Sequence, residues 1–202
     1  LLHFDAHADL RESYNNQKFS HASAIKRCLD YKNVSVISFG IRNISADEIS
    51  YLKKNSKRIK IFWAKDKVKW NLKYFKKLIK NKNVYLTFDV DGLDSSIMPA
   101  TGTPEPGGLF WDETLKILKI ASKNSNIVGA DVNELSPIKG FNSYNFLVAK
   151  LVYKILSYKF LYNWSSLKTP DNNLKGINII KATNIFTERS PKERVIQGMF
   201  VP

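Results

Sequence analysis

The fold of this chain is set by the segment Val84-Tyr85-Leu86-Thr87-Phe88-Asp89-Val90-Asp91, in which a short apolar run leads into two carboxylates. A short run of β-branched and aromatic residues of this kind is typical of a buried strand. Similar runs recur along the chain, with longer helix-like segments between them. The strand-like runs are Val34–Gly40, Ile59–Phe62, Val84–Phe88 and Ile127–Ala130. This alternating order predicts the α/β class, with a parallel sheet that helices cover on both faces.

Four segments between and after these runs have helical character. They are Asp47–Lys57, Trp70–Lys80, Trp111–Lys123 and Asn142–Leu161. The last one carries an apolar stripe with helical spacing, which predicts that it packs on the sheet. Beyond it the sequence becomes rich in turn residues, with one apolar stretch at Ile177–Ile180. We therefore expect one catalytic domain over residues 1–161 and a tail, residues 162–202, to which the sequence assigns no role.

Length and composition favour a globular protein. The chain has 202 residues, of which 44% are hydrophobic, so a single domain can bury a core. No apolar run approaches the roughly 18 residues that a membrane span needs, and the segment Leu1–Asp5 lacks the features of a secretory signal. The lone Cys28 cannot form an internal disulfide. These features predict a cytoplasmic protein with no membrane partner.

The net charge of +14 raises an alternative, a basic module that binds nucleic acid. The lysines are scattered, however, and fall mostly where amphipathic helices would turn a face to solvent. No recognisable nucleic-acid-binding motif accompanies them. A nucleic-acid partner is therefore the less favoured interpretation.

Potential metal ligands gather in three places, each at or just after the end of an expected strand. The first is Asp5-Ala6-His7-Ala8-Asp9, the second is Asp89-Val90-Asp91, and the third is the single Glu134. On an extended chain, alternate residues point to the same side. In open parallel sheets, ligands bind at the carboxyl ends of the strands. Taken alone, each group could be an ordinary loop feature, because Asp and Asn commonly end strands.

Together the three groups predict a divalent metal site. Carboxylates that converge at one sheet edge would repel one another and be poorly solvated unless a cation neutralised them. Mixed imidazole and carboxylate ligands suit manganese, although zinc or iron remain possible from ligand type alone. One ion would not require four carboxylates, and two-metal centres hold their ions about 3.5–4 Å apart. We therefore expect a binuclear site.

Several short blocks, in this order and spacing, resemble the arginase and agmatinase (ureohydrolase) family. The resemblance extends from about Leu1 to Leu161. The blocks are His3–Asp9, Ser20–Ser23, Ser38–Arg42, Thr87–Asp94, Pro99–Leu109 and Asp131–Glu134.

This resemblance implies a three-layer α/β/α fold and an enzyme that hydrolyses a guanidino compound to urea through hydroxide bridging two Mn²⁺ ions. It implies that the small cationic substrate meets two catalytic residues, His21 as an acid/base group and Glu134 as the partner of the guanidinium. The implied metal ligands are Asp5, His7, Asp9, Asp89 and Asp91. A hydroxide at neutral pH is what two bound cations can supply.

The segment Asp9–Ser23 is more similar to agmatinase-like sequences than to arginases, which favours agmatine, cleaved to putrescine and urea. Arginine, guanidinobutyrate and other guanidino compounds stay open, because such contacts come from variable loops.

The family pattern also includes an earlier Gly-Gly-Asp-His block that supplies another histidine ligand, and this chain begins after it. We therefore expect an N-terminally incomplete domain that lacks its first strands and one ligand. A metal site that lacks a ligand binds its ion weakly. A truncated, inactive relative is thus a further alternative. The resemblance also implies a homo-oligomer.

Overall fold

A computed structural model describes residues 1–163, which form a five-stranded sheet in the order β3-β2-β1-β4-β5. Each strand runs parallel to its neighbours. The strands are β1 (Leu2–Phe4), β2 (Val36–Phe39), β3 (Ile59–Phe62), β4 (Asn83–Asp89) and β5 (Asn126–Asn133). The predicted parallel sheet is confirmed. The short β1 lies at its centre, with β2 on one side and β4 on the other.

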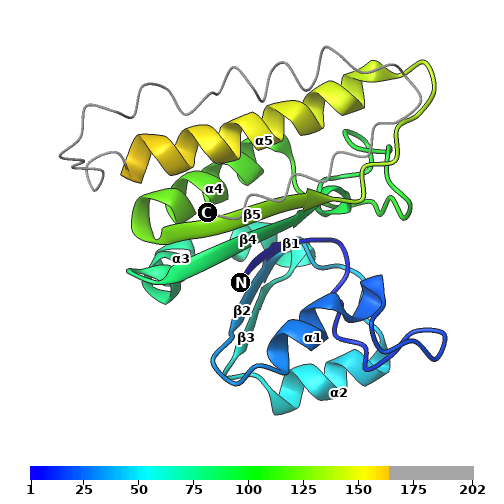
Figure 1. The fold of residues 1–202 in the computed structure, drawn as a ribbon, viewed down its shortest axis with the longest axis vertical. Coiled ribbons are helices and arrows are strands. Elements are labelled where there is room, and N and C mark those ends of the chain that lie inside the picture. Colours follow the sequence, from blue (N-terminus) through cyan, green and yellow to red (C-terminus); the bar gives the residue numbers. More distant parts are fainter. Residues whose placement is uncertain (164–202) are drawn as a thin grey trace, which may run out of the picture.

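Helices cover both faces of the sheet, so the predicted three-layer α/β/α fold is confirmed. Figure 1 shows α1 and α2 on one side of the strands, and α4 and α5 on the other. Helix α3 shares the second side, because its buried residues belong to the same core as those of α4. The helices are α1 (Ala24–Leu29), α2 (Ala46–Lys54), α3 (Leu72–Ile79), α4 (Trp111–Asn124) and α5 (Asn142–Asn163).

The larger core lies between the sheet and helices α3, α4 and α5. Alternate residues of the central strands point into it, and the rings of Phe4, Phe39 and Phe88 stack across three neighbouring strands. A smaller core on the opposite face packs α1 and α2 against the other side of β2 and β3, through residues such as Ile25 and Val36. This tight packing fixes the strand ends that carry the polar residues described below.

The expected elements are present, with boundaries set by local capping. The helix expected from Trp70 begins two residues later, because the Asn71 side chain caps it by accepting a hydrogen bond from the backbone N–H of Tyr74 at 2.9 Å. Helix α1 was not predicted, since its six residues are too few for a clear apolar period. The tail from residue 164, including the apolar stretch Ile177–Ile180, lies outside the described residues.

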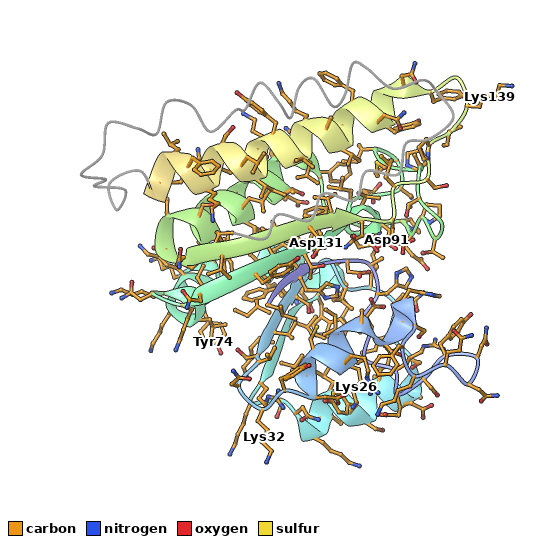
Figure 2. All side chains as sticks on the ribbon, in the orientation of Figure 1. Lys26, Lys32, Tyr74, Asp91, Asp131 and Lys139 are labelled. Atoms are coloured by element: carbon orange, nitrogen blue, oxygen red, sulfur yellow. The ribbon has the colours of Figure 1, made fainter. Side chains whose placement is uncertain are left out.

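None of the helices in residues 1–163 combines the length and apolar character needed to cross a bilayer. The lysines are spread around the molecule, as Figure 2 illustrates with the exposed Lys32 and Lys139 at opposite ends. Lys32 and Lys139 thus face solvent, as the sequence predicts for most lysines.

Candidate metal centre

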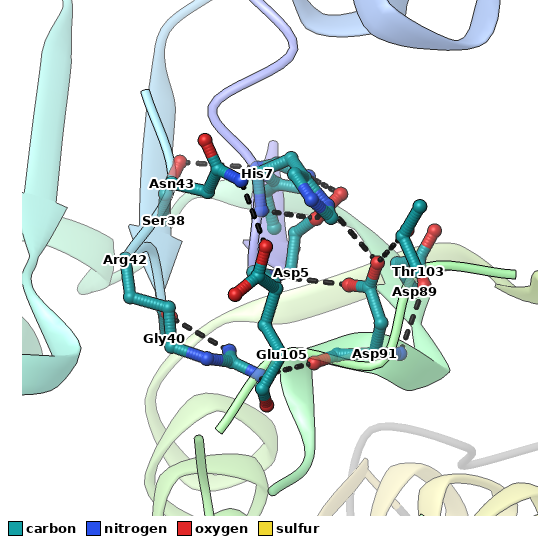
Figure 3. Close-up of polar contacts among 12 residues, drawn as sticks. Asp5, His7, Ser38, Gly40, Arg42, Asn43, Asp89, Asp91, Thr103 and Glu105 are labelled. Carbon is teal, nitrogen blue, oxygen red and sulfur yellow. Dashed lines mark hydrogen bonds and ion pairs between the residues drawn. The ribbon is translucent and has the colours of Figure 1, made fainter. Parts of the chain in front are cut away.

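The central strands β1 and β4 deliver the candidate ligands to one edge of the sheet. Phe4 pairs with Phe88 in the parallel register, so the next residues, Asp5 and Asp89, follow side by side. Figure 3 shows the side chains of Asp5, His7 and Asp91 pointing toward one another there. The two groups of ligands, far apart in sequence, thus meet at the carboxyl edge of the sheet.

Three of the predicted ligands are in direct contact. His7 Nδ1 lies 3.0 Å from Asp91 Oδ2 and 3.4 Å from Asp5 Oδ1. Backbone N–H groups hold both carboxylates, because His7 N donates to Asp5 Oδ1 at 2.6 Å and Ala6 N donates to Asp91 Oδ1 at 2.9 Å. Each of the three residues offers a ligand atom within 4.8 Å of the other two.

Asp9 belongs to a second group of potential ligands, whereas Asp89 belongs to neither group among the described residues. A ligand atom of Asp9 lies within 4.8 Å of one from Asp5 and one from His3. Asp89 Oδ1 accepts a hydrogen bond from the backbone N–H of Asp91 at 2.9 Å. The expectation of a fully extended Asp5–Asp9 segment was wrong, since Asp9 has φ +54°, in the left-handed region. The chain bends there and still returns Asp9 toward Asp5.

The surroundings of the cluster do not solvate all of its carboxylates in their charged form. Burial and the charges of Asp5 and Asp91 raise the pKa of Asp9 to about 8. Burial and the same two charges raise the pKa of Asp89 to about 10. Hydrogen bonds to Asp5 and Asp91 raise the pKa of His7 to about 10. Protons therefore occupy positions in the cluster that a cation could take.

Asp5 behaves differently from its neighbours. Burial acts to raise the pKa of Asp5, but the charge of His3 and hydrogen bonds from His3 and His7 outweigh it and hold the pKa below its ordinary value. Asp5 therefore stays ionised where Asp9 and Asp89 keep their protons. It is also the residue common to both groups of potential ligands, His3-Asp5-Asp9 and Asp5-His7-Asp91.

The donor set fits divalent cations. Carboxylate oxygens and imidazole nitrogens are ligands that Mn²⁺ accepts, and the described residues offer two overlapping groups of three potential ligands, His3-Asp5-Asp9 and Asp5-His7-Asp91. The raised pKa values of Asp9 and Asp89 give a physical reason for cation binding at this cluster. Bound cations would relieve the repulsion that keeps these two groups protonated.

The two predicted catalytic residues lie on segments that border this cluster. Glu134 follows β5 by one residue, and its charge contributes to the raised pKa of Asp89, so the two carboxylates are near each other. Glu134 has φ +64°, so the chain turns sharply at this point. It is exposed.

His21 begins the 3₁₀ turn His21–Ser23 and is exposed. Its ring packs edge-on against the ring of Tyr14, with 5.3 Å between the two ring centroids. Two backbone hydrogen bonds tie this part of the chain to the ligand segment: Arg11 N donates to Ala22 O, and Lys26 N donates to Asp9 O. Among the described residues, His21 makes no hydrogen bond or ion pair with the five ligands. The cluster and His21 are thus linked through the backbone that follows Asp9.

Arg42 is a residue that the sequence did not assign. Its guanidinium is half-buried and donates hydrogen bonds to five carbonyls, which belong to three segments around the ligands. They are the carbonyls of Gly40, Asp91, Leu93, Glu105 and Pro106. Arg42 therefore ties the Pro- and Gly-rich loop, residues 99–108, to the chain that directly follows β4. In that loop Thr103 Oγ1 donates to Asp91 Oδ2 at 3.2 Å.

His3 was quoted in the family pattern but given no role. Its ring is buried, with Nε2 2.8 Å from Asp5 Oδ2 and Nδ1 3.2 Å from Ser38 Oγ. The signal in the sequence was its position two residues before Asp5, which places both side chains on one face of the strand.

The fold and the cluster together define a class: a three-layer domain with a parallel sheet and a cluster of carboxylates and imidazoles at its carboxyl edge. Residues 1–157 match the family model of the Arginase family. Since this match covers well over half of the chain, the chain belongs to the arginase family.

Individual relatives agree with this assignment. The chain is 34% identical over 161 residues to the N(1)-aminopropylagmatine ureohydrolase of Synechocystis sp., covering 78% of this chain and 51% of the relative. It is 39% identical over 139 residues to the agmatinase of Halalkalibacterium halodurans, covering 68% and 47%. The crystal structure of the agmatine ureohydrolase of Thermoplasma volcanium superposes with a TM-score of 0.70 at 28% identity, covering 82% and 56%. The chain spans about half the length of the curated relatives it matches.

Proposed function

We propose that this chain carries the metal-binding part of a manganese-dependent ureohydrolase, which hydrolyses a guanidino compound to urea. The observation that carries the proposal is the meeting of Asp5, His7 and Asp91 at the carboxyl edge of the sheet, with Asp9 in a second group of potential ligands that shares Asp5. Membership of the arginase family supports it, as does similarity to proteins named N(1)-aminopropylagmatine ureohydrolase and agmatinase.

The five predicted ligands would hold two Mn²⁺ ions. When bound, such a pair of cations supplies a water whose pKa is low enough for hydroxide to be available near neutral pH. The backbone N–H groups of Ala6 and His7 hold the Asp91 and Asp5 carboxylates toward the centre of the cluster. Thr103 adds a hydroxyl donor to Asp91. This local scaffold keeps like charges together before any substrate arrives.

Glu134 is the proposed partner of the substrate guanidinium. A carboxylate can accept two parallel hydrogen bonds from a planar guanidinium, which fixes its plane as well as its charge. Glu134 is exposed at the end of β5, and it acts on Asp89 electrostatically. An exposed carboxylate close to Asp89 supports this role.

His21 is the proposed proton donor to the leaving amine. An imidazole titrates near neutral pH, so it can give up and regain a proton in each turnover. Its exposed position, on a turn that is hydrogen-bonded to the ligand segment, leaves it able to meet a substrate from the solvent side.

Agmatine is the proposed substrate. Named relatives include an agmatinase and an N(1)-aminopropylagmatine ureohydrolase, and both names denote guanidino compounds. A protein of net charge +14 repels such cations at long range, but salt screens charges beyond about 8–10 Å. Within that distance of the site, the acidic cluster therefore determines that a cationic substrate is attracted.

The test is urea release by the purified protein that contains this chain, after its metal has been stripped and Mn²⁺ returned. We expect Mn²⁺-dependent urea release with agmatine that exceeds the release with N(1)-aminopropylagmatine or arginine. The Asp91→Asn variant serves as the control that lacks one ligand. If urea were released faster from one of the other two compounds, that compound would replace agmatine as the substrate. Mn²⁺ binding without urea release from any of them would favour the inactive relative instead.

A further inference from the structure

His3 occupies a central and fully enclosed position beneath the ligand cluster. It is only 2% exposed, and its strand β1 is paired on both sides, with His3 opposite Ser38 on β2 and Thr87 on β4. The backbone of His3 therefore has little freedom. The direction of its ring is set by the side-chain contacts at the two ring nitrogens.

Both ring nitrogens of His3 have partners. Nε2 lies 2.8 Å from Asp5 Oδ2, and Nδ1 lies 3.2 Å from Ser38 Oγ. When Nε2 carries the proton it donates to Asp5, and Nδ1 then accepts from the Ser38 hydroxyl. Ser38 thereby favours the tautomer that Asp5 needs.

Asp5 is held at both of its oxygens. Oδ2 meets His3, while Oδ1 accepts from the backbone N–H of His7 at 2.6 Å. This matters because Asp5 is the one residue shared by both groups of potential ligands. A rotated Asp5 carboxylate would disturb both ion positions together.

We propose that His3 is a positioning residue, which fixes the Asp5 carboxylate in the plane that both metal ions require, with Ser38 as its own support. The inference rests on the proposed function, since it assumes that the cluster binds divalent ions. Hydrogen-bonded partners of metal ligands commonly have this effect, and their loss costs about 10–100-fold in metal affinity.

The test compares Mn²⁺ binding to the metal-stripped chain and four variants, measured from the electron paramagnetic resonance signal of free Mn²⁺. His3→Leu removes both ring nitrogens, whereas His3→Gln keeps a donor that can reach Asp5. Ser38→Ala removes only the support. Thr87→Val is the matched control: it deletes a hydroxyl from the same row of the sheet, where Thr87 donates to Asp131 and not to a proposed ligand. Circular dichroism checks that each variant is folded.

We expect His3→Leu to weaken Mn²⁺ binding about 10–100-fold, His3→Gln to bind nearly as the unchanged chain does, and Ser38→Ala to lie between them. Thr87→Val should leave the affinity unchanged. Equal affinity in His3→Leu and the unchanged chain would overturn the role of His3 alone.

Equal losses in His3→Gln and His3→Leu, with one ion fewer bound, would show that His3 is itself a ligand with Asp5 and Asp9, and would replace the proposal. Absence of Mn²⁺ binding by the unchanged chain would overturn the proposed function and this inference with it.

Discussion

Asp5 and Glu134 illustrate how two carboxylates at the same sheet edge take different environments. Asp5 is buried and held at both oxygens, whereas Glu134 is exposed and stands alone at the end of β5. A carboxylate with fixed oxygens suits a metal ion, and an open one suits an incoming cation. Neutralising Asp5 should therefore affect metal binding, whereas neutralising Glu134 should affect the use of a cationic substrate.

The first prediction compares Glu134→Gln with Asp89→Asn. Each change keeps the side-chain size and replaces a carboxyl group, which can ionise, by an amide, which cannot. We expect Glu134→Gln to leave bound manganese near normal while urea release falls steeply, by about 100-fold or more, because the guanidinium loses its anion. Asp89→Asn should lose manganese. Metal analysis and urea assays on the same samples check this, and loss of metal from Glu134→Gln would assign Glu134 to the ions instead.

The ligand pattern could be predicted from the sequence because it depends on the spacing of residues within one segment. Carboxylates and an imidazole at alternate positions directly after a strand can be recognised in such a segment. The roles of Arg42 and His3 could not be predicted this way. Arg42 reaches carbonyls up to 64 residues away, and His3 reaches a serine 35 residues away. Such contacts depend on which strands become neighbours, and residue spacing within one segment does not contain that information.

At the scale of elements, Glu48 joins helix α2 to the ligand segment. Its Oε1 accepts from the backbone N–H of Leu10 at 2.9 Å, directly after Asp9. Its Oε2 accepts from the backbone N–H of Ser45 at 2.8 Å, which caps the helix. One buried side chain therefore stabilises both the helix start and the bend at Asp9.

The second prediction is that Glu48→Ala lowers the free energy of unfolding by about 1–3 kcal/mol, because the buried N–H of Leu10 loses its acceptor. The adjacent Asp47→Ala is the matched control, since Asp47 lies exposed in the same helical turn. Urea denaturation of both variants measures the difference. Equal stability of the two variants would mean that water replaces Glu48 at Leu10.

The Pro- and Gly-rich loop that follows β4 is packed closely against the backbone it faces. A Cβ added at Gly108 would lie 2.6 Å from the backbone N of Asp94 and the carbonyl carbon of Leu93. At Gly102, in the same loop, an added Cβ meets nothing within 4 Å. The loop therefore contains one position where a methyl group cannot fit and one where it can.

The third prediction follows from this contrast. Gly108→Ala should lower the free energy of unfolding by about 1–3 kcal/mol, because backbone atoms must move to admit the methyl group. Gly102→Ala should stay within about 0.5 kcal/mol of the unchanged chain. Chemical denaturation checks both values. A neutral Gly108→Ala variant would show that the loop moves freely away from Leu93.

Apart from the short helix α1, the order of helices and strands could be predicted, because the long amphipathic helices and apolar strands alternate clearly. Element ends were less predictable, since they depend on caps such as Asn71 and on pairing partners. Strand β5 reaches Asn133, beyond the expected Ala130, because it pairs with β4 along its whole length as far as Asp89. Pairing of this kind brings Glu134 to the ligand edge.

At the scale of the whole molecule, the metal cluster couples stability to pH. The pKa values of Asp9 and Asp89 are raised to about 8 and about 10, and that of His7 to about 10. In the unfolded chain, carboxyls titrate near pH 4 and imidazole near 6.5. Between those values and the raised ones, the folded metal-free protein therefore holds more protons than the unfolded chain.

The last prediction follows from the sign of this difference. A state that binds more protons is favoured at low pH, so the stabilising contribution of these groups is complete below about pH 4 for Asp9 and Asp89 and below about pH 6.5 for His7. It declines as the pH rises toward the raised values. We therefore expect the thermal midpoint of the metal-free protein to fall between pH 6 and pH 8 in the presence of a chelator.

Mn²⁺ should reverse this trend, because ions bind the deprotonated ligands and displace the protons. Each displaced proton makes the apparent affinity rise by about tenfold per pH unit, so the stabilisation by Mn²⁺ should be larger at pH 8 than at pH 6. Scanning calorimetry with and without Mn²⁺ at each pH measures this stabilisation. A stabilisation independent of pH would mean that the cluster is already ionised before the metal binds.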